Sequence, residues 1–288
     1  SNTTLTIRYL TGGGVEANVP SNDLTTLTAN IEFLNSSLDA TTAQTIFNSV
    51  AVTNSTASSG GGDGDTIDEI RQNSLSQFAT QQRTVTADDY LVRALSMPSN
   101  YGSISKAHIT SVSLKDSPNA ENTPILDLYT LTYDQNKKLA TPSSTLKQNL
   151  RTYLSQYRMI GDVVNIKEAF IVNIGVNFGI IVLPNYNSSE VILNCINSLI
   201  EYFSIDKWQI NQPIILKELY VLLDRVEGVQ TVDNVEIVNK VGESLGYSRF
   251  GYDILGATSS RIVYPSLDPM IFEVKYPTTD ISGKVVSF

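Results

Sequence analysis

Apolar and polar side chains alternate with a period of two in the middle of the chain. Residues 104–114 and 125–133 both follow this pattern, and a polar loop containing Pro118 and Asn119 separates them. Successive side chains of a strand point to opposite faces of a sheet. The alternation therefore predicts two half-buried strands that pair with each other.

A longer β-branched run follows at residues 163–183. Its length predicts either one strand with a bend or two strands, and Gly175 and Gly179 mark places where the backbone bulges or packs closely. Further strands are predicted at residues 229–238, 261–264 and 271–276. Strands therefore recur through the second half of the chain without regular alternation with helices.

Two predicted helices have clear N-terminal signals. Thr66 stands three residues before Glu69, the spacing of a capping box in which hydroxyl and carboxylate each satisfy a free backbone N–H. Thr86 can cap the second helix, because two aspartates follow in its first turn and meet the positive end of the helix dipole. An apolar stripe continues from there, and Pro98 ends it.

Helical periodicity also marks residues 145–159 and a segment that begins at Ser188 or Ser189. Residues 211–213 are predicted to begin another helix, because proline is favoured in the first turn. Mixed strands and segregated helices in this order predict the α+β class, with two or more small modules.

Composition divides the chain into four segments. The first is rich in Ser, Thr and Asn, which predicts short strands and long loops, and residues 54–64, with their run of Gly and Ser, follow as a linker or exposed turn. The chain begins at Ser1 rather than at methionine, which is typical of a fragment or a processed product. The predicted organisation is a β-rich N-terminal segment at residues 1–59, a glycine-rich turn with two capped helices at 60–100, an α+β core module at 101–240 and a β-rich tail at 241–288.

The chain is acidic and poor in charge. Its formal net charge is -9, its pI is near 4.7, and 17% of its residues are charged. Nucleic-acid-binding domains concentrate lysine and arginine, so no nucleic-acid partner is expected. The longest apolar run is far shorter than the roughly 20 residues that span a bilayer, so membrane insertion is not expected. Uncharged polar surfaces suit burial against neighbouring subunits, since the cores of interfaces are depleted in charge.

Reactive side chains are scarce. His108, the only histidine, lies in the first alternating segment and is interpreted as an ordinary polar strand residue. Cys195, the only cysteine, lies on an apolar helix face and is interpreted as a small buried side chain. No Gly-x-Ser-x-Gly elbow accompanies any serine, which argues against a hydrolase. Paired carboxylates stay open as an alternative, because spacing along the chain does not reveal their separation in space.

The glycine-rich run at residues 60–65 permits two interpretations as a site. It lacks the lysine and the Ser or Thr that complete a phosphate-binding loop. A calcium loop would use Asp63, Asp65 and Asp68, but Asp68 stands at the sixth position, where the tight turn requires glycine. A flexible connection into a capped helix is preferred over metal binding. The sequence therefore predicts no catalytic residue, no cofactor and no metal site, and we expect a protein that is not an enzyme.

Two stretches resemble the signature of the baseplate-J family of contractile-tailed bacteriophages. Residues 60–71 are GGGDGDTIDEIR, and residues 82–90 are QRTVTADDY. The family typically shows a Gly-Gly-x-Asp segment leading into an acidic helix, then an Arg-x-Val-Thr-x-x-Asp-Tyr segment that opens another helix. Similarity at residues 8–19 and 219–229 extends the resemblance over most of the chain before Val238.

Within that family the chain looks most like the C-terminal part of the baseplate wedge protein of T-even-type phages. The resemblance implies a late structural protein of the virion, located in the tail baseplate and assembled in the host cytoplasm. It also implies a homodimer or a higher ring assembly that contacts other wedge proteins in the inner baseplate ring. The family motif is not catalytic, so the residues expected to act as framework rather than as a binding site are Asp63, Thr66, Arg83, Thr86, Asp89 and Tyr90.

A carbohydrate-binding or host-recognition module of a phage tail is the alternative function. It is suggested by the 14 tyrosines and by the Asn- and Thr-rich first segment. Aromatic residues at structural spacing belong to the core more often than to a binding site, so the structural role is preferred.

Overall fold

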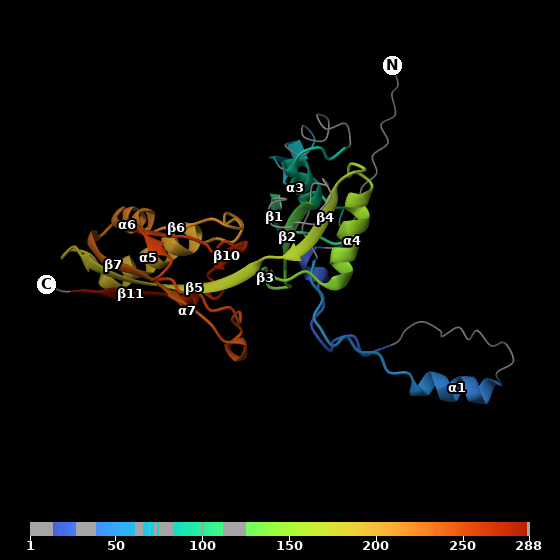
Figure 1. The fold of residues 1–288 in the computed structure, drawn as a ribbon. Coiled ribbons are helices and arrows are strands. Elements are labelled where there is room, and N and C mark those ends of the chain that lie inside the picture. The colour runs from blue at the N-terminus through green and yellow to red at the C-terminus, as the bar shows by residue number, and fades with distance from the viewer. Residues whose placement is uncertain are drawn as a thin grey trace, which may run out of the picture.

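The computed structural model describes residues 14–26, 39–60, 66–68, 70–71, 74, 83–98, 101–111 and 125–286. Within these residues, helices and three sheets form an α+β fold, as predicted. Figure 1 shows two bodies joined by one long strand, and an arm that leaves them. We call the first body lobe 1 (residues 83–98, 101–111 and 125–168) and the second lobe 2 (residues 170–286).

A four-stranded sheet forms the centre of lobe 1. β2 (Ile125–Tyr133) pairs antiparallel with β1 (Lys106–Ser111) along one edge. Along its other edge it pairs with β3 (Leu139–Ala140), which is antiparallel, and with β4 (Val163–Glu168), which is parallel. The predicted pairing of the first two strands is confirmed.

Two helices pack together against one face of this sheet. These are α3 (Ala87–Leu95) and α4 (Ser144–Ser155), and Tyr90, Leu128 and Leu150 are fully buried between them and the strands. α4 begins where predicted but ends four residues before the predicted end at residue 159.

The predicted cap of α3 is confirmed. Thr86 Oγ1 accepts a hydrogen bond from Asp89 N at 3.2 Å, and Asp89 Oδ2 accepts one from Thr86 N at 2.8 Å. This reciprocal pair satisfies two backbone donors that the first turn of a helix leaves free. The local sequence alone therefore fixes where α3 begins.

β4 continues into β5 (Phe170–Val182) with only Ala169 between them, which is the second of the two alternatives that the sequence left open. β5 leaves lobe 1 and becomes the central strand of the sheet in lobe 2 (Figure 1). It pairs antiparallel with β7 (Val229–Asn239) on one side and parallel with β10 (Met270–Glu273) and β11 (Ile281–Val285) on the other.

Helices α5 (Ser188–Tyr202) and α6 (Leu216–Asp224) pack against the sheet of lobe 2. The predicted start of α6 at residues 211–213 is wrong. Asn211 has a left-handed φ of 62°, which interrupts any helix, and β6 (Ile214–Ile215) pairs with another strand before α6 begins. The short elements that complete the fold are η1 (Val15–Ala17), η4 (Glu243–Leu245), β8 (Thr258–Ser259), β9 (Ile262–Val263) and α7 (Pro277–Asp280).

The N-terminal segment holds a helix, α1 (Ala40–Ser49), where short strands were predicted, so that prediction is wrong there. The side chain of Asp39 caps the helix by accepting from Thr42 N at 3.1 Å. Thr45 Oγ1 donates to the carbonyl of Thr41 at 2.9 Å. The hydroxyls that favour loops elsewhere are therefore satisfied by the helix backbone.

Part of the second predicted segment lies outside the described residues. This holds for Asp63 and Asp65 of the glycine-rich run and for Glu69 of the first capping box. Among the described residues that follow Thr66, residues 67–68, 70–71 and 74 are helical, as predicted. The four predicted segment boundaries stay a prediction.

Gly175 of β5 has no room for a side chain, as its predicted close packing requires. A Cβ there would lie 2.8 Å from the carbonyl oxygen of Asp280 and 2.7 Å from Lys240 Cε. We expect Gly175→Ala to lower the free energy of unfolding by about 1–3 kcal/mol, because the neighbours must move apart. Gly161→Ala is the matched control, since nothing lies within 4 Å of its Cβ position. Urea denaturation measures both variants, and equal stabilities would contradict this packing.

Candidate assembly surfaces

An arm carries α1 away from the two lobes (Figure 1). The arm comprises the described residues 18–26 and 39–59. Several hydrogen bonds hold its stalk, and in two of them Ser58 N donates to Val19 O at 2.8 Å and Asn22 N donates to Asn54 O at 2.7 Å. None of the residues of α1 is buried. The stalk therefore holds α1 out without packing it against a core.

After the capping residue Asp39, the arm carries no charge. Residues 40–62 contain no Asp, Glu, Lys, Arg or His. On α1 and directly after it, Ile46 is 36% exposed, Val50 is 45% exposed, and Phe47 is only partly buried. Isolated helices shorter than about 12–15 residues are marginal in water without tertiary packing. α1 therefore presents an apolar face that the described part of the chain leaves uncovered.

Polar contacts join lobe 1 to lobe 2, and we call this contact the seam. Lys106 of β1 is buried, and its Nζ donates to the carbonyl of Asp206 at 3.1 Å. The hydroxyl of Tyr133 donates to Asp206 Oδ1 at 3.2 Å. Burial lowers the pKa of Lys106, and burial together with the Asp206 carboxylate raises the pKa of Tyr133. Lys106 is the buried member of these contacts, and Asp206 lies at the exposed edge of the seam.

Glu273 of β10 forms the second part of the seam and is 2% exposed. Its Oε1 accepts from the backbone N–H of Leu139 in lobe 1 at 2.9 Å, and its Oε2 accepts from Asn173 Nδ2 of β5 at 2.8 Å. Burial raises the pKa of Glu273, although the Leu139 N–H and the charges of Lys275 and Lys138 act against that shift. Both carboxylate oxygens are thus occupied within the chain.

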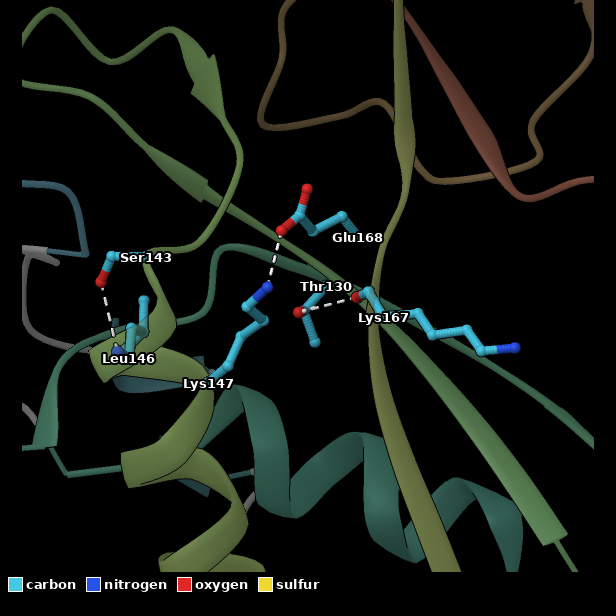
Figure 2. A network of polar contacts seen from close by, with 6 residues as sticks. All are labelled: Thr130, Ser143, Leu146, Lys147, Lys167 and Glu168. Atoms are coloured by element: carbon cyan, nitrogen blue, oxygen red, sulfur yellow. Dashed lines mark hydrogen bonds and ion pairs between the residues drawn. The ribbon is translucent and has the colours of Figure 1, made fainter.

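The strand that crosses between the lobes is braced where it leaves lobe 1, as Figure 2 shows. Lys147 of α4 forms an ion pair with Glu168, the last residue of β4, at 2.7 Å. Thr130 of β2 donates its hydroxyl to the carbonyl of Lys167 at 3.3 Å. A helix and a neighbouring strand therefore hold β4 just before Ala169.

His108 and Cys195 lie where the sequence predicted. His108 is a half-buried residue of β1, burial lowers its pKa, and its Nε2 lies 3.4 Å from Asn211 Nδ2, which makes it part of the seam. Cys195 is fully buried on α5, and burial raises the pKa of its thiol to about 11. Among the described contacts none joins the two side chains.

The motif residues that the structure describes hold lobe 1 together. Thr86 and Asp89 cap α3, and the hydroxyl of the buried Tyr90 donates to Asp162 Oδ2 at 2.7 Å. Within the described ranges, no group of three or more His, Cys, Asp or Glu side chains has an arrangement that suits a metal ion. No helix of those ranges is both long and apolar enough to cross a membrane.

Sequence reasoning missed the polar residues of the seam, although a signal for them exists. Asn173 interrupts an apolar run in β5, and Glu273 interrupts another in β10. A polar side chain at an inward strand position needs a hydrogen-bond partner. The two interruptions therefore indicate a buried polar contact, but they do not name its partner.

No protein-family model matches the chain, and no curated protein matches it in sequence. Membership of the baseplate-J family therefore stays a prediction. Among solved structures, a chain of the baseplate of the anti-feeding prophage is similar, with a TM-score of 0.46 and 13% sequence identity. The similarity covers 92% of this chain and 51% of that one, so this chain spans about half the length of its neighbour. Similarity at this level does not extend the neighbour's function to this chain.

Ionisation of Glu273 should make folding stability depend on pH. Its pKa in the folded chain lies above the ordinary value of 4.5. Between those two values the folded chain binds more protons than the unfolded chain, so the free energy of unfolding falls as the pH rises. In Glu273→Gln this contribution is absent, and we expect the wild type to lose stability relative to the variant as the pH increases through that window.

Urea denaturation from about pH 4 to pH 8 measures this difference. Glu236→Gln is the matched control, because Glu236 is an exposed residue of β7 and its replacement should leave the pH dependence as in the wild type. The same pH dependence in wild type and Glu273→Gln would contradict the role assigned to burial.

Proposed function

We propose that the chain is a structural subunit of a contractile-tail baseplate, and not an enzyme. It acts by self-association, as a homodimer or a ring, and by contacts with other wedge proteins of the inner baseplate ring. Its place is in the virion, after assembly in the host cytoplasm. The observation that carries the proposal is α1, an uncharged helix with an apolar face held outside both lobes. The baseplate-J signature at residues 60–71 and 82–90 supports the baseplate assignment.

Charge favours the arm as a contact between copies. Each copy has a formal net charge of -9, so two copies repel each other, most strongly where acidic surfaces approach. At physiological ionic strength this repulsion is screened over about 8 Å. An uncharged helix held away from lobe 2, where 13 Asp and Glu outnumber 8 Lys and Arg, makes contact without bringing those acidic surfaces together.

The free energy gained by burying the apolar face of α1 is small, which favours repeated contacts over a single strong one. Ile46, Phe47 and Val50 would each contribute at most about 1.5–3 kcal/mol on full burial. Association costs roughly 4–15 kcal/mol in lost translational and rotational freedom. One arm alone therefore binds weakly, and a ring in which each copy makes several such contacts gains affinity from their number.

The placement of the tyrosines does not favour the alternative of a carbohydrate-binding module. Several tyrosine hydroxyls donate to carboxylates inside the chain, and an engaged hydroxyl is not free to recognise a sugar. The pairs are Tyr90–Asp162, Tyr133–Asp206, Tyr186–Glu227, Tyr202–Glu218 and Tyr247–Asp280.

Substitution of the apolar face of α1 should abolish self-association. At tens of micromolar we expect the wild type to form dimers or larger species, and the double variant Ile46→Ser with Phe47→Ser to be monomeric, because it loses the apolar contact. Gln44→Ser, on the same helix, is the matched control and should associate like the wild type. Size-exclusion chromatography with light scattering measures the mass. A monomeric wild type, or a double variant that associates fully, would count against the arm.

The baseplate assignment predicts a location. Antibodies raised against the chain should label purified contractile tails, from particles that carry the protein, at the baseplate end in electron micrographs. Labelling along the sheath, or no labelling of intact tails, would contradict the assignment whatever the outcome for the arm.

A further inference from the structure

A groove runs along α6 on the surface of lobe 2. It consists of two adjoining hollows of about 400 Å³ each, which share Tyr202, Glu218 and Leu222. α5 contributes Tyr202, and α6 contributes Leu222 together with Val221, which is 43% exposed. β6 adds Ile215. An apolar strip that spans two helices is therefore accessible at the surface of this lobe.

The charges that line the groove nearly cancel. The lining holds three cationic and two anionic side chains. Lys207 forms an ion pair with Glu201 at 3.0 Å. Glu218 lies in the first turn of α6 and Arg225 caps its other end, where each complements the dipole of that helix. Among the described side chains of the lining, only Lys217 is left without an opposite charge, so the groove favours an uncharged ligand over a strongly charged one.

α1 has the pattern of a helix that binds in a groove. Ala43, Ile46, Phe47 and Val50 stand at positions i, i+3, i+4 and i+7, which places them on one face. α1 has 10 residues and α6 has 9, so the two helices are roughly 14 to 15 Å long. Residues 40–62 carry no charge, which suits a groove whose charges nearly cancel.

The groove and α1 lie far apart in one copy of the chain. α6 belongs to lobe 2, and the arm holds α1 on the opposite side of lobe 1 (Figure 1). At the base of the arm, Asn18 Nδ2 donates to the carbonyl of Tyr133 in lobe 1 at 3.5 Å. In this arrangement α1 does not reach the groove of its own copy, and a contact between them joins two copies.

We infer that the groove along α6 binds α1 of a neighbouring copy, with Ile46 and Phe47 packed against Val221 and Leu222. The inference rests on the proposed self-association and names the surface that receives the arm. The contact uses different surfaces of the two partners, so each copy binds one neighbour through its arm and another through its groove. Repetition of such a heterologous contact forms a ring where the rotation closes.

Val221→Lys should prevent self-association, because it places an ammonium group against the apolar face of α1. We expect the dissociation constant of the assembly to rise roughly tenfold or more. Leu193→Lys on α5 is the matched control and should associate like the wild type, since Leu193 is 56% exposed and does not line the groove. Analytical ultracentrifugation measures the three proteins, and circular dichroism checks that each is folded.

A mixture of two variants tests which surfaces meet. Ile46→Ser with Phe47→Ser keeps the groove, and Val221→Lys keeps the arm, so each should be monomeric alone. Their 1:1 mixture should form a dimer held by one arm in one groove. It should need a higher concentration than the wild type, because repeated contacts are missing. If α1 instead paired with α1 of another copy, Val221→Lys would associate by itself like the wild type.

Cross-linking tests the same contact if Val221→Lys does not fold. A short bismaleimide should join Ile46→Cys copies to Val221→Cys copies in a mixture. Cys195 is fully buried, so the native thiol contributes little to the reaction. Leu193→Cys in place of Val221→Cys is the control and should give only background cross-linking.

Failure of the groove and failure of the proposed function give different results. Wild-type affinity in folded Val221→Lys, a mixture that stays monomeric, or equal cross-linking to Leu193→Cys and Val221→Cys would overturn the inference and leave the role of α1 standing. A wild type that stays monomeric at every concentration would overturn both the inference and the self-association on which it rests.

Discussion

Both lobes depend on one continuous stretch of extended backbone. β4 pairs with β2 in the first sheet, and after Ala169 the same chain becomes β5, the central strand of the second sheet. Ala169 itself is 2% exposed and belongs to the hydrophobic core, so a rotation at this point would disturb that packing. The two lobes therefore cannot reorient freely unless the contacts around Ala169 break.

The seam fixes the angle between the two lobes, which the shared strand alone does not determine. Lys106, Asn173 and Glu273 of the seam are polar and buried, so each must find a partner, and the geometry that satisfies them together is restrictive. Such contacts contribute less to net stability than apolar packing, because removing a charge from water opposes the gain. Their effect is specificity: one arrangement of the lobes satisfies these groups, and others leave a buried charge alone.

The sequence predicts elements whose signals are local. Thr86 and Asp89 specify their own helix start, and the alternation at residues 125–133 specifies a strand without reference to the rest of the chain.

Prediction from the sequence fails where hydrogen-bond partners are distant along the chain. Asn211 takes a left-handed conformation and exchanges hydrogen bonds with Met270, 59 residues away, and no local pattern reports that. The buried contact of Glu273 has the same origin, because it meets Leu139 only through tertiary packing. α1 was missed for the opposite reason, since its Thr- and Ser-rich composition indicates loops although its hydroxyls bond to their own helix.

In the proposed role, the two lobes and the uncharged arm would divide the work of assembly between them. A subunit that joins a ring must present its contacts at a fixed angle, and the shared strand and the seam supply that angle. It must also tolerate acidic neighbours, and residues 40–62 supply a contact free of charge. Since α1 is marginal as an isolated helix, part of the energy of each contact is used to order it. Contacts of this kind are individually weak and collectively strong, so an assembly built from them forms firmly and can still exchange one set of contacts for another.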